Sequence, residues 1–151
     1  MSRSHVVLLA AGTAALSLIP AAAIGKSTRK VAFTNTASGA SLSATRSALA
    51  DHDSVFGNGA GVQTTKTAPS GTSGTDTTIV YYGNATLTSH DSFSIGQPDA
   101  NGIAAVTGKG HDFKGTGKAK GVTSTYTFTG TFNTKTTVYT VKLKGTYTLP
   151  R

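Results

Sequence analysis

The stretch GHDFKGTGKAKGVTSTYTFTGTF, residues 110–132, carries the pattern that decides the fold. Taken in steps of two, one set of its side chains is small or aromatic: Phe113, Gly115, Gly117, Ala119 and Gly121. The alternate set is polar: Lys114, Thr116, Lys118 and Lys120. Because unpaired lysines are rarely buried, the alternation predicts a strand with its lysines in solvent and its small residues facing the interior.

A second strand follows this one in a shifted register. Its apolar set is Tyr126, Phe128, Gly130 and Phe132, which are even-numbered, whereas the preceding inward residues are odd-numbered. A shift of one residue moves every side chain to the other face of a sheet, so we expect a bulge or tight turn within residues 122–125.

The same alternation recurs along the second half of the chain. It is clearest at the C-terminus, where the inward set is Tyr139, Val141, Leu143, Gly145, Tyr147 and Leu149. A further strand is predicted over residues 79–88, with Ile79, Tyr81, Gly83, Ala85 and Leu87 on one face. Short strands are expected at 93–95 and 103–107, with turns at 96–102 and 133–137.

The composition also favours strands. The 151 residues include 27 Thr and 18 Gly, but no Glu, Trp or Cys. Thr favours strands, and inward Gly permits the strong coiling that closes a barrel, whereas a chain without Glu is poor in helix formers. We therefore expect an all-β, antiparallel barrel of about eight strands over residues 51–151, without disulfides. Residues 24–50 are predicted to be a flexible segment with one helical turn near 44–50, and a flexible loop is expected around 69–74.

The N-terminus has the features of an export signal. Residues 6–19 carry no charge, and Pro20 then precedes Ala21, Ala22 and Ala23. The run is shorter than the about 20 apolar residues that a membrane-spanning helix needs. We expect a signal peptide over residues 1–23, cleaved after Ala23, and a secreted, extracellular protein that does not span the membrane.

The net charge is concentrated in the last part of the chain. Residues 24–107 hold five basic residues and five Asp, whereas residues 108–151 hold eight basic residues and one Asp. Five lysines fall on the predicted solvent face: Lys114, Lys118, Lys120, Lys142 and Lys144. This surface could associate with an anionic envelope polymer. The aromatic residues share the inward face instead of alternating with these lysines outside, so no specific nucleic-acid binding is expected.

Residues 114–130, KGTGKAKGVTSTYTFTG, resemble the Gly-Thr-Gly-Lys-x-Lys/Arg-x-x-Gly-type strand of the dirigent and allene oxide cyclase-like β-barrels. Residues 115–118 and Lys120 match that pattern, whereas Ala119 stands where an aromatic residue is common and Gly121 arrives early. The resemblance implies a secreted or plastid eight-stranded barrel around a small-molecule pocket, and it leaves a homo-oligomer open. The stretches YYGNATLTS, residues 81–89, and GTYT, residues 145–148, also resemble those of a group of small secreted actinobacterial proteins. The matching motif is structural, so no catalytic residue is carried over from it.

Each histidine of residues 24–151 precedes an aspartate, which makes His90, Asp91, His111 and Asp112 weak catalytic candidates beside His52-Asp53. A His acid/base or a His/Asp metal site is one interpretation. The alternative is that the pairs lie at loop edges, with Asp accepting turn hydrogen bonds. Adjacent residues of a strand point to opposite faces, which favours the alternative. All six Asp are predicted in loops, and no motif indicates a cofactor or metal, so none is expected.

These observations favour a binding module over an enzyme. The small inward residues leave volume that aromatic side chains or a small apolar or aromatic ligand must occupy. The predicted lining residues are Tyr81, Phe113, Gly115, Gly117, Tyr126, Phe128 and Tyr139. A cyclase or isomerase of the dirigent or allene oxide cyclase kind, and an envelope-associated protein with a basic face, remain the alternatives.

Overall fold

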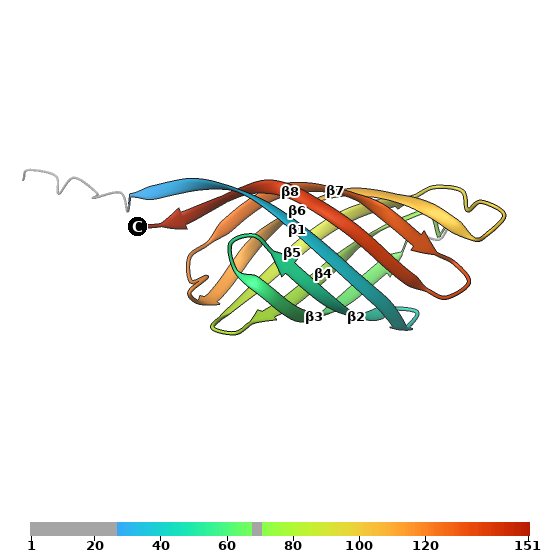
Figure 1. Cartoon of the computed structure of the whole chain (residues 1–151), viewed down its shortest axis with the longest axis horizontal. Helices are drawn as coiled ribbons and strands as arrows, with labels where there is room; N and C mark the ends of the chain where they lie inside the picture. Colours follow the sequence, from blue (N-terminus) through green and yellow to red (C-terminus); the bar gives the residue numbers. More distant parts are fainter. Residues whose placement is uncertain (1–26, 68–70) are drawn as a thin grey trace, which may run out of the picture.

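The computed structural model describes residues 27–67 and 71–151, so the predicted signal peptide lies outside the described residues. Eight strands account for most of the described chain (Figure 1). Their bounds are β1 Thr28–Ser43, β2 Arg46–Asp53, β3 Gly57–Thr67, β4 Ser73–Tyr82, β5 Ala85–Ile95, β6 Ile103–Gly117, β7 Thr123–Asn133 and β8 Val138–Pro150. No helix long and apolar enough to cross a membrane occurs in this part of the chain.

The strands form a closed, antiparallel, up-and-down barrel. Each strand pairs with the next along the chain, and β8 closes the barrel by pairing with β1 from Thr28↔Pro150 to Ala40↔Val138. Closure leaves no strand edge with unpaired backbone groups, which is the usual hazard of an open sheet. The predicted all-β antiparallel fold is confirmed.

The two ends of the barrel differ. At one end, which we call the closed end, the β6–β7 connection is packed into the core: Ala119 and Val122 are 0% and 1% exposed. Ala119 lies directly against Gly115, and a Cβ added at Gly115 would collide with the backbone of Ala119. The other end, which we call the open end, carries the β1–β2, β3–β4, β5–β6 and β7–β8 connections. Gly117 and Gly121 have positive φ, as the tight β6–β7 connection requires.

Inward glycines are paired across strands with inward aromatic rings. In each case the two residues are direct antiparallel partners, and a Cβ on the glycine would overlap the ring. The pairs are Phe33–Gly145, Gly39–Tyr139, Gly59–Tyr82, Gly74–Phe93, Gly108–Phe128 and Gly110–Tyr126. The rings therefore lie flat along the wall instead of crossing the interior, and glycine accommodates them without widening the barrel.

The N-terminal part of the barrel was not predicted correctly. Residues 28–50, expected to be flexible with one helical turn, form β1 and most of β2 instead. The many small side chains of these residues are typical of a flexible segment, which is why no strand is predicted from the sequence there. Within β1 the alternation is nevertheless present, because Phe33, Asn35, Ala37 and Gly39 are buried.

The inward register of β4 also differs from the prediction. Thr78, Val80 and Tyr82 are buried, whereas Ile79 points outward and Tyr81 is 56% exposed. The chain reverses in a two-residue turn at residues 83–84, and Tyr82 pairs directly with Ala85. A turn of two residues keeps both partners on one face, so the predicted single strand over 79–88 assigned the wrong face to its first half.

A bulge at Phe113 overturns the predicted inward position of this residue. Ser89 pairs with Asp112 and Thr88 with Lys114, which leaves Phe113 without a partner on β5 and 52% exposed. The register change thus lies at Phe113 and in the β6–β7 connection, not within 122–125. In contrast, β7 and β8 follow the prediction, and the five lysines of the predicted basic surface are exposed.

Candidate functional site

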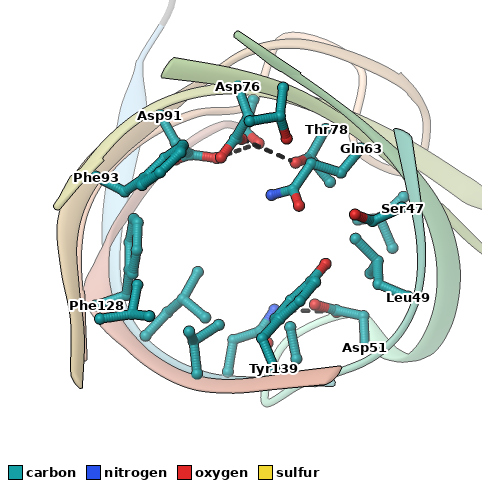
Figure 2. A pocket seen from close by; sticks show the side chains of 18 of the residues that line it. Ser47, Leu49, Asp51, Gln63, Asp76, Thr78, Asp91, Phe93, Phe128 and Tyr139 are labelled. Carbon is teal, nitrogen blue, oxygen red and sulfur yellow. Dashed lines mark hydrogen bonds between the residues drawn. The ribbon is translucent and has the colours of Figure 1, made fainter. Parts of the chain in front are cut away.

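The barrel encloses a cavity of about 310 Å³ that is lined by residues from all eight strands. It extends to the open end, because Ala44 and Gly71 of the β1–β2 and β3–β4 connections line it and are exposed. Figure 2 shows side chains from the surrounding strands pointing into a free central lumen. The cavity is within the size range of small-molecule sites.

The first polar group of this cavity is a pair of aspartates. Asp76 and Asp91 are direct partners on β4 and β5, and their carboxyl groups are hydrogen-bonded to each other (Figure 2). Tyr126 Oη donates to Asp91 Oδ1 at 2.6 Å, and Thr78 Oγ1 donates to Asp76 Oδ1 at 3.2 Å. The Gln63 side chain is hydrogen-bonded to Asp76 as well. Both carboxyl groups are therefore fixed in orientation.

The environment of the Asp76–Asp91 pair raises the pKa of both carboxyl groups. Burial, followed by the nearby charge of Asp76, raises the pKa of Asp91 to about 8. Burial also raises the pKa of Asp76, although the hydrogen bond from Asp91 opposes that shift. Two carboxyl groups in contact within a poorly solvated site cannot both ionise easily. Asp91 thus donates and Asp76 accepts, as in a general acid–base pair.

A second polar group lies on another wall. Asp51 accepts hydrogen bonds from Tyr82 Oη at 2.8 Å and from Asn35 Nδ2 at 2.9 Å. Burial raises the pKa of Asp51. Asn35 also lines the cavity and is only 7% exposed, yet its Oδ1 has no hydrogen-bond partner. A buried acceptor without a donor is costly unless something else supplies one.

Two further aspartates complete the interior set. Asp53 accepts hydrogen bonds from Tyr147 Oη at 2.8 Å and from the backbone N–H groups of Val55 and Phe56, so it fixes the β2–β3 connection. Asp112 is hydrogen-bonded to Ser124 Oγ, and burial raises the pKa of Asp112 to about 6. Asp53 has a structural role, whereas Asp112 contributes a further acidic group to the cavity lining.

Aromatic rings supply the apolar part of the site. Phe93, Phe128 and Tyr139 border the lumen in Figure 2, and Phe132 and Leu143 extend this lining. The hydroxyl of Tyr139 is buried without a hydrogen-bond partner. The cavity therefore combines aromatic walls with a small number of fixed polar groups, which is the usual composition of a ligand site.

The two histidine–aspartate candidate pairs are divided between the faces of the barrel. Asp91 and Asp112 are buried inside, whereas His90 and His111 lie outside, with ring centroids 6.1 Å apart. The expectation that each pair lies at a loop edge, with its Asp accepting turn hydrogen bonds, holds for Asp53. It is wrong for the other two pairs, which lie within strands. In the described ranges, no group of three or more His or Asp side chains is placed to hold a metal ion.

Three of the seven predicted lining residues line the cavity: Tyr126, Phe128 and Tyr139. Gly115 and Gly117 lie toward the closed end and are not part of the lining, and Tyr81 and Phe113 lie on the outer surface, as described above. The prediction missed Asp51, Asp76 and the other polar lining residues. A signal was present, because continuing the inward alternation of Ala85 and Leu87 leads to Ser89, Asp91 and Phe93.

Charge is segregated between the two faces. Every lysine and arginine side chain in the described part of the chain is exposed, whereas five of the six aspartates are buried. The inside of the barrel is thus acidic and the outside basic. Asp99 is the exception, and it lies in the exposed β5–β6 connection.

Comparison with other proteins adds no family assignment. No protein-family model matches the chain, and no curated protein or solved structure matches it.

Proposed function

We propose that the protein binds a small molecule with an apolar or aromatic body inside the barrel. The observation that carries the proposal is the free lumen of about 310 Å³, which extends to the open end and is lined by aromatic rings and a few fixed polar groups. A barrel whose side chains served only as a core would be filled to the density of a protein interior.

Native mass spectrometry of the protein isolated from the cells or medium that produce it tests the proposal, because it detects a retained ligand by its mass. Ser47→Trp directs a large side chain into the cavity, whereas Ala48→Trp places the same side chain on the outer face as a matched control. We expect one small molecule per chain in the wild type and in Ala48→Trp, and none in Ser47→Trp. Equal occupancy in both variants, or no binding of any aromatic probe by the wild type, would refute binding inside the barrel.

We also propose that the protein is related to the dirigent and allene oxide cyclase-like barrels. Residues 114–130 resemble a strand of those barrels, and this barrel, like them, has eight antiparallel strands. We further propose that the chain is exported and cleaved after Ala23, which N-terminal sequencing of the natural protein tests. A first residue other than Ile24 would contradict the proposed cleavage site.

Acid–base catalysis, such as an isomerisation or cyclisation, is a second candidate function favoured by the Asp76–Asp91 pair. A proton-sharing carboxyl pair at a cavity can both donate and accept a proton near neutral pH. If the pair is catalytic, the wild type converts a compound that the Asp91→Asn variant still binds but no longer converts. Unchanged turnover in that variant would exclude the pair as the catalytic group.

Association of the outer face with an anionic envelope polymer is a third candidate. The segregation of charge favours it, because the exposed lysines are not balanced by exposed aspartates apart from Asp99. Binding to polyglutamate as a model polyanion should weaken as salt is raised. Binding that is independent of salt would reject this mode.

A further inference from the structure

The interior of the barrel offers hydrogen-bond acceptors in excess of donors. Four aspartates line the cavity, and Arg46, near the open end, is the one basic residue among the described lining residues. An ionised carboxyl group has about four acceptor positions. A ligand that complements this lining therefore supplies hydrogen-bond donors, and preferably charged ones.

The acidic groups face each other across the lumen. In Figure 2, Asp76 and Asp91 point inward from one wall and Asp51 from the opposite one, with Phe93 and Phe128 beside them. All five residues line the same cavity. A ligand that enters from the open end thus meets aromatic faces and carboxyl groups together.

We infer that the ligand of the proposed site is a small organic cation, whose ammonium group lies against the Asp76–Asp91 pair and whose apolar body contacts Phe93, Phe128 and Tyr139. This inference rests on the proposed function and specifies the class of ligand. An ammonium group has three donors and no acceptor, which complements a lining of carboxylates. Aromatic faces also attract cations, most strongly where water is excluded.

Other ligand charges fit this lining less well. An anion would face four carboxyl groups with Arg46 as its one cationic partner in the described lining. A neutral aromatic molecule would displace water from Asp51 and Asp76 without supplying a charge, which leaves buried carboxylates unpaired. A cation pairs with them in an environment where charge–charge attraction is strong. The lining therefore selects for positive charge as well as for an apolar body.

Binding of a cation should release a proton. In the free protein the groups facing the Asp76–Asp91 pair from inside the barrel are Asp112 and the hydroxyls of Tyr126, Ser89 and Thr78, none of which is cationic, and His90, on the outer face, lowers the pKa of Asp76. A bound ammonium group favours the ionised form of both carboxyl groups, so the shared proton leaves to solvent. A neutral ligand has no such effect. Proton release is thus a signature of the charge of the ligand.

Isothermal titration calorimetry with three probes of similar shape tests the inference. The probes are phenethylamine, phenethyl alcohol and hydrocinnamate, used at pH 7 in two buffers that differ in ionisation enthalpy. We expect the amine to bind at least about tenfold more tightly than the alcohol, as a hydrogen bond to a charged group predicts. We expect the amine alone to release protons, and the carboxylate to bind most weakly.

Asp76→Asn and Asp91→Asn should each reduce the preference for the amine over the alcohol to about threefold or less. Asp99→Asn is the matched control, because Asp99 is an exposed loop residue and Asn can accept the same backbone hydrogen bonds from Asn101 and Ile103. Far-UV circular dichroism checks that each variant is folded. The proton-release measurement on the wild type remains decisive if a variant does not fold.

The outcomes separate the two proposals. Equal binding of the amine and the alcohol, or binding of the amine without proton release, overturns the cation inference while small-molecule binding stands. Binding of the alcohol without binding of the amine would also overturn the cation inference while small-molecule binding stands. If none of the three probes binds, the cation inference and the proposed function both fail. Selective binding of the amine that is lost in Asp91→Asn and kept in Asp99→Asn supports both.

Discussion

The buried aspartates predict that the barrel is most stable in mild acid. A carboxyl group whose pKa is raised by folding keeps its proton in the folded state after the unfolded chain has lost it. The folded state therefore binds more protons, and the free energy of unfolding falls as pH rises. The contribution is complete below pH 3.8 and is lost through about pH 6 for Asp112 and about pH 8 for Asp91.

The size of the effect follows from these pKa values. At about 1.4 kcal/mol per pH unit, the change from 3.8 to about 8 at Asp91 corresponds to about 6 kcal/mol. The change from 3.8 to about 6 at Asp112 corresponds to about 3 kcal/mol. The two aspartates interact, so these values do not add. The window from pH 4 to pH 8 covers about 5 kcal/mol of the Asp91 change, so with Asp112 we expect a total loss of about 5 to 7 kcal/mol, which is a large part of the stability of a typical domain.

Urea unfolding at unit steps from pH 4 to pH 8 measures this loss directly, with far-UV circular dichroism and tyrosine fluorescence as probes. Asp91→Asn removes the group with the highest of these carboxyl pKa values, so its stability should depend much less on pH and should exceed that of the wild type at pH 8. Asp99→Asn should retain the wild-type slope. A stability that rises from pH 4 to pH 8, or equal slopes for the wild type and Asp91→Asn, would refute the assignment of a buried protonated pair.

Three further predictions concern packing, the hydrogen-bond network and the outer surface. Gly108→Ala should lower the free energy of unfolding by about 2 kcal/mol or more, because the new Cβ meets an aromatic ring and a backbone oxygen, whereas Gly96→Ala should be nearly neutral in the same urea assay. Tyr126→Phe removes a donor to the aspartate pair and should destabilise by about 2 kcal/mol, more at pH 8 than at pH 5; equal losses at both pH values would contradict this. Lys142→Gln with Lys144→Gln should weaken binding to polyglutamate several-fold at low salt without changing phenethylamine binding, and unchanged polyglutamate binding would exclude that face.

The C-terminal half of the fold could be predicted from the sequence because its strands alternate large apolar with charged or polar side chains. In β8, Lys142 and Lys144 can only face solvent, so Val141 and Leu143 must face inward. The β1 strand gave no such contrast, since its inward positions include Asn35, Ala37 and Gly39. Gly39 is small because the ring of Tyr139 occupies the space beside it, and Tyr139 lies 100 positions along the chain.

The polar half of the site is missed from the sequence because interior carboxylates violate the rule that charged residues face solvent. Loops are predicted for Asp51, Asp76 and Asp91, although each continues the inward alternation of its strand. Their positions become intelligible only when the hydroxyl donors from other strands are placed, as with Tyr82 and Tyr126. The bulge at Phe113 had no sequence signal, because it depends on the register with β5.

The most direct test of the account is a crystal structure of the protein grown at neutral pH with saturating phenethylamine. We expect one molecule in the lumen, with its nitrogen about 3 Å from a carboxyl oxygen of Asp76 or Asp91 and its ring against Phe128. A lumen filled by protein side chains, or a free lumen in which the amine does not bind, would contradict it.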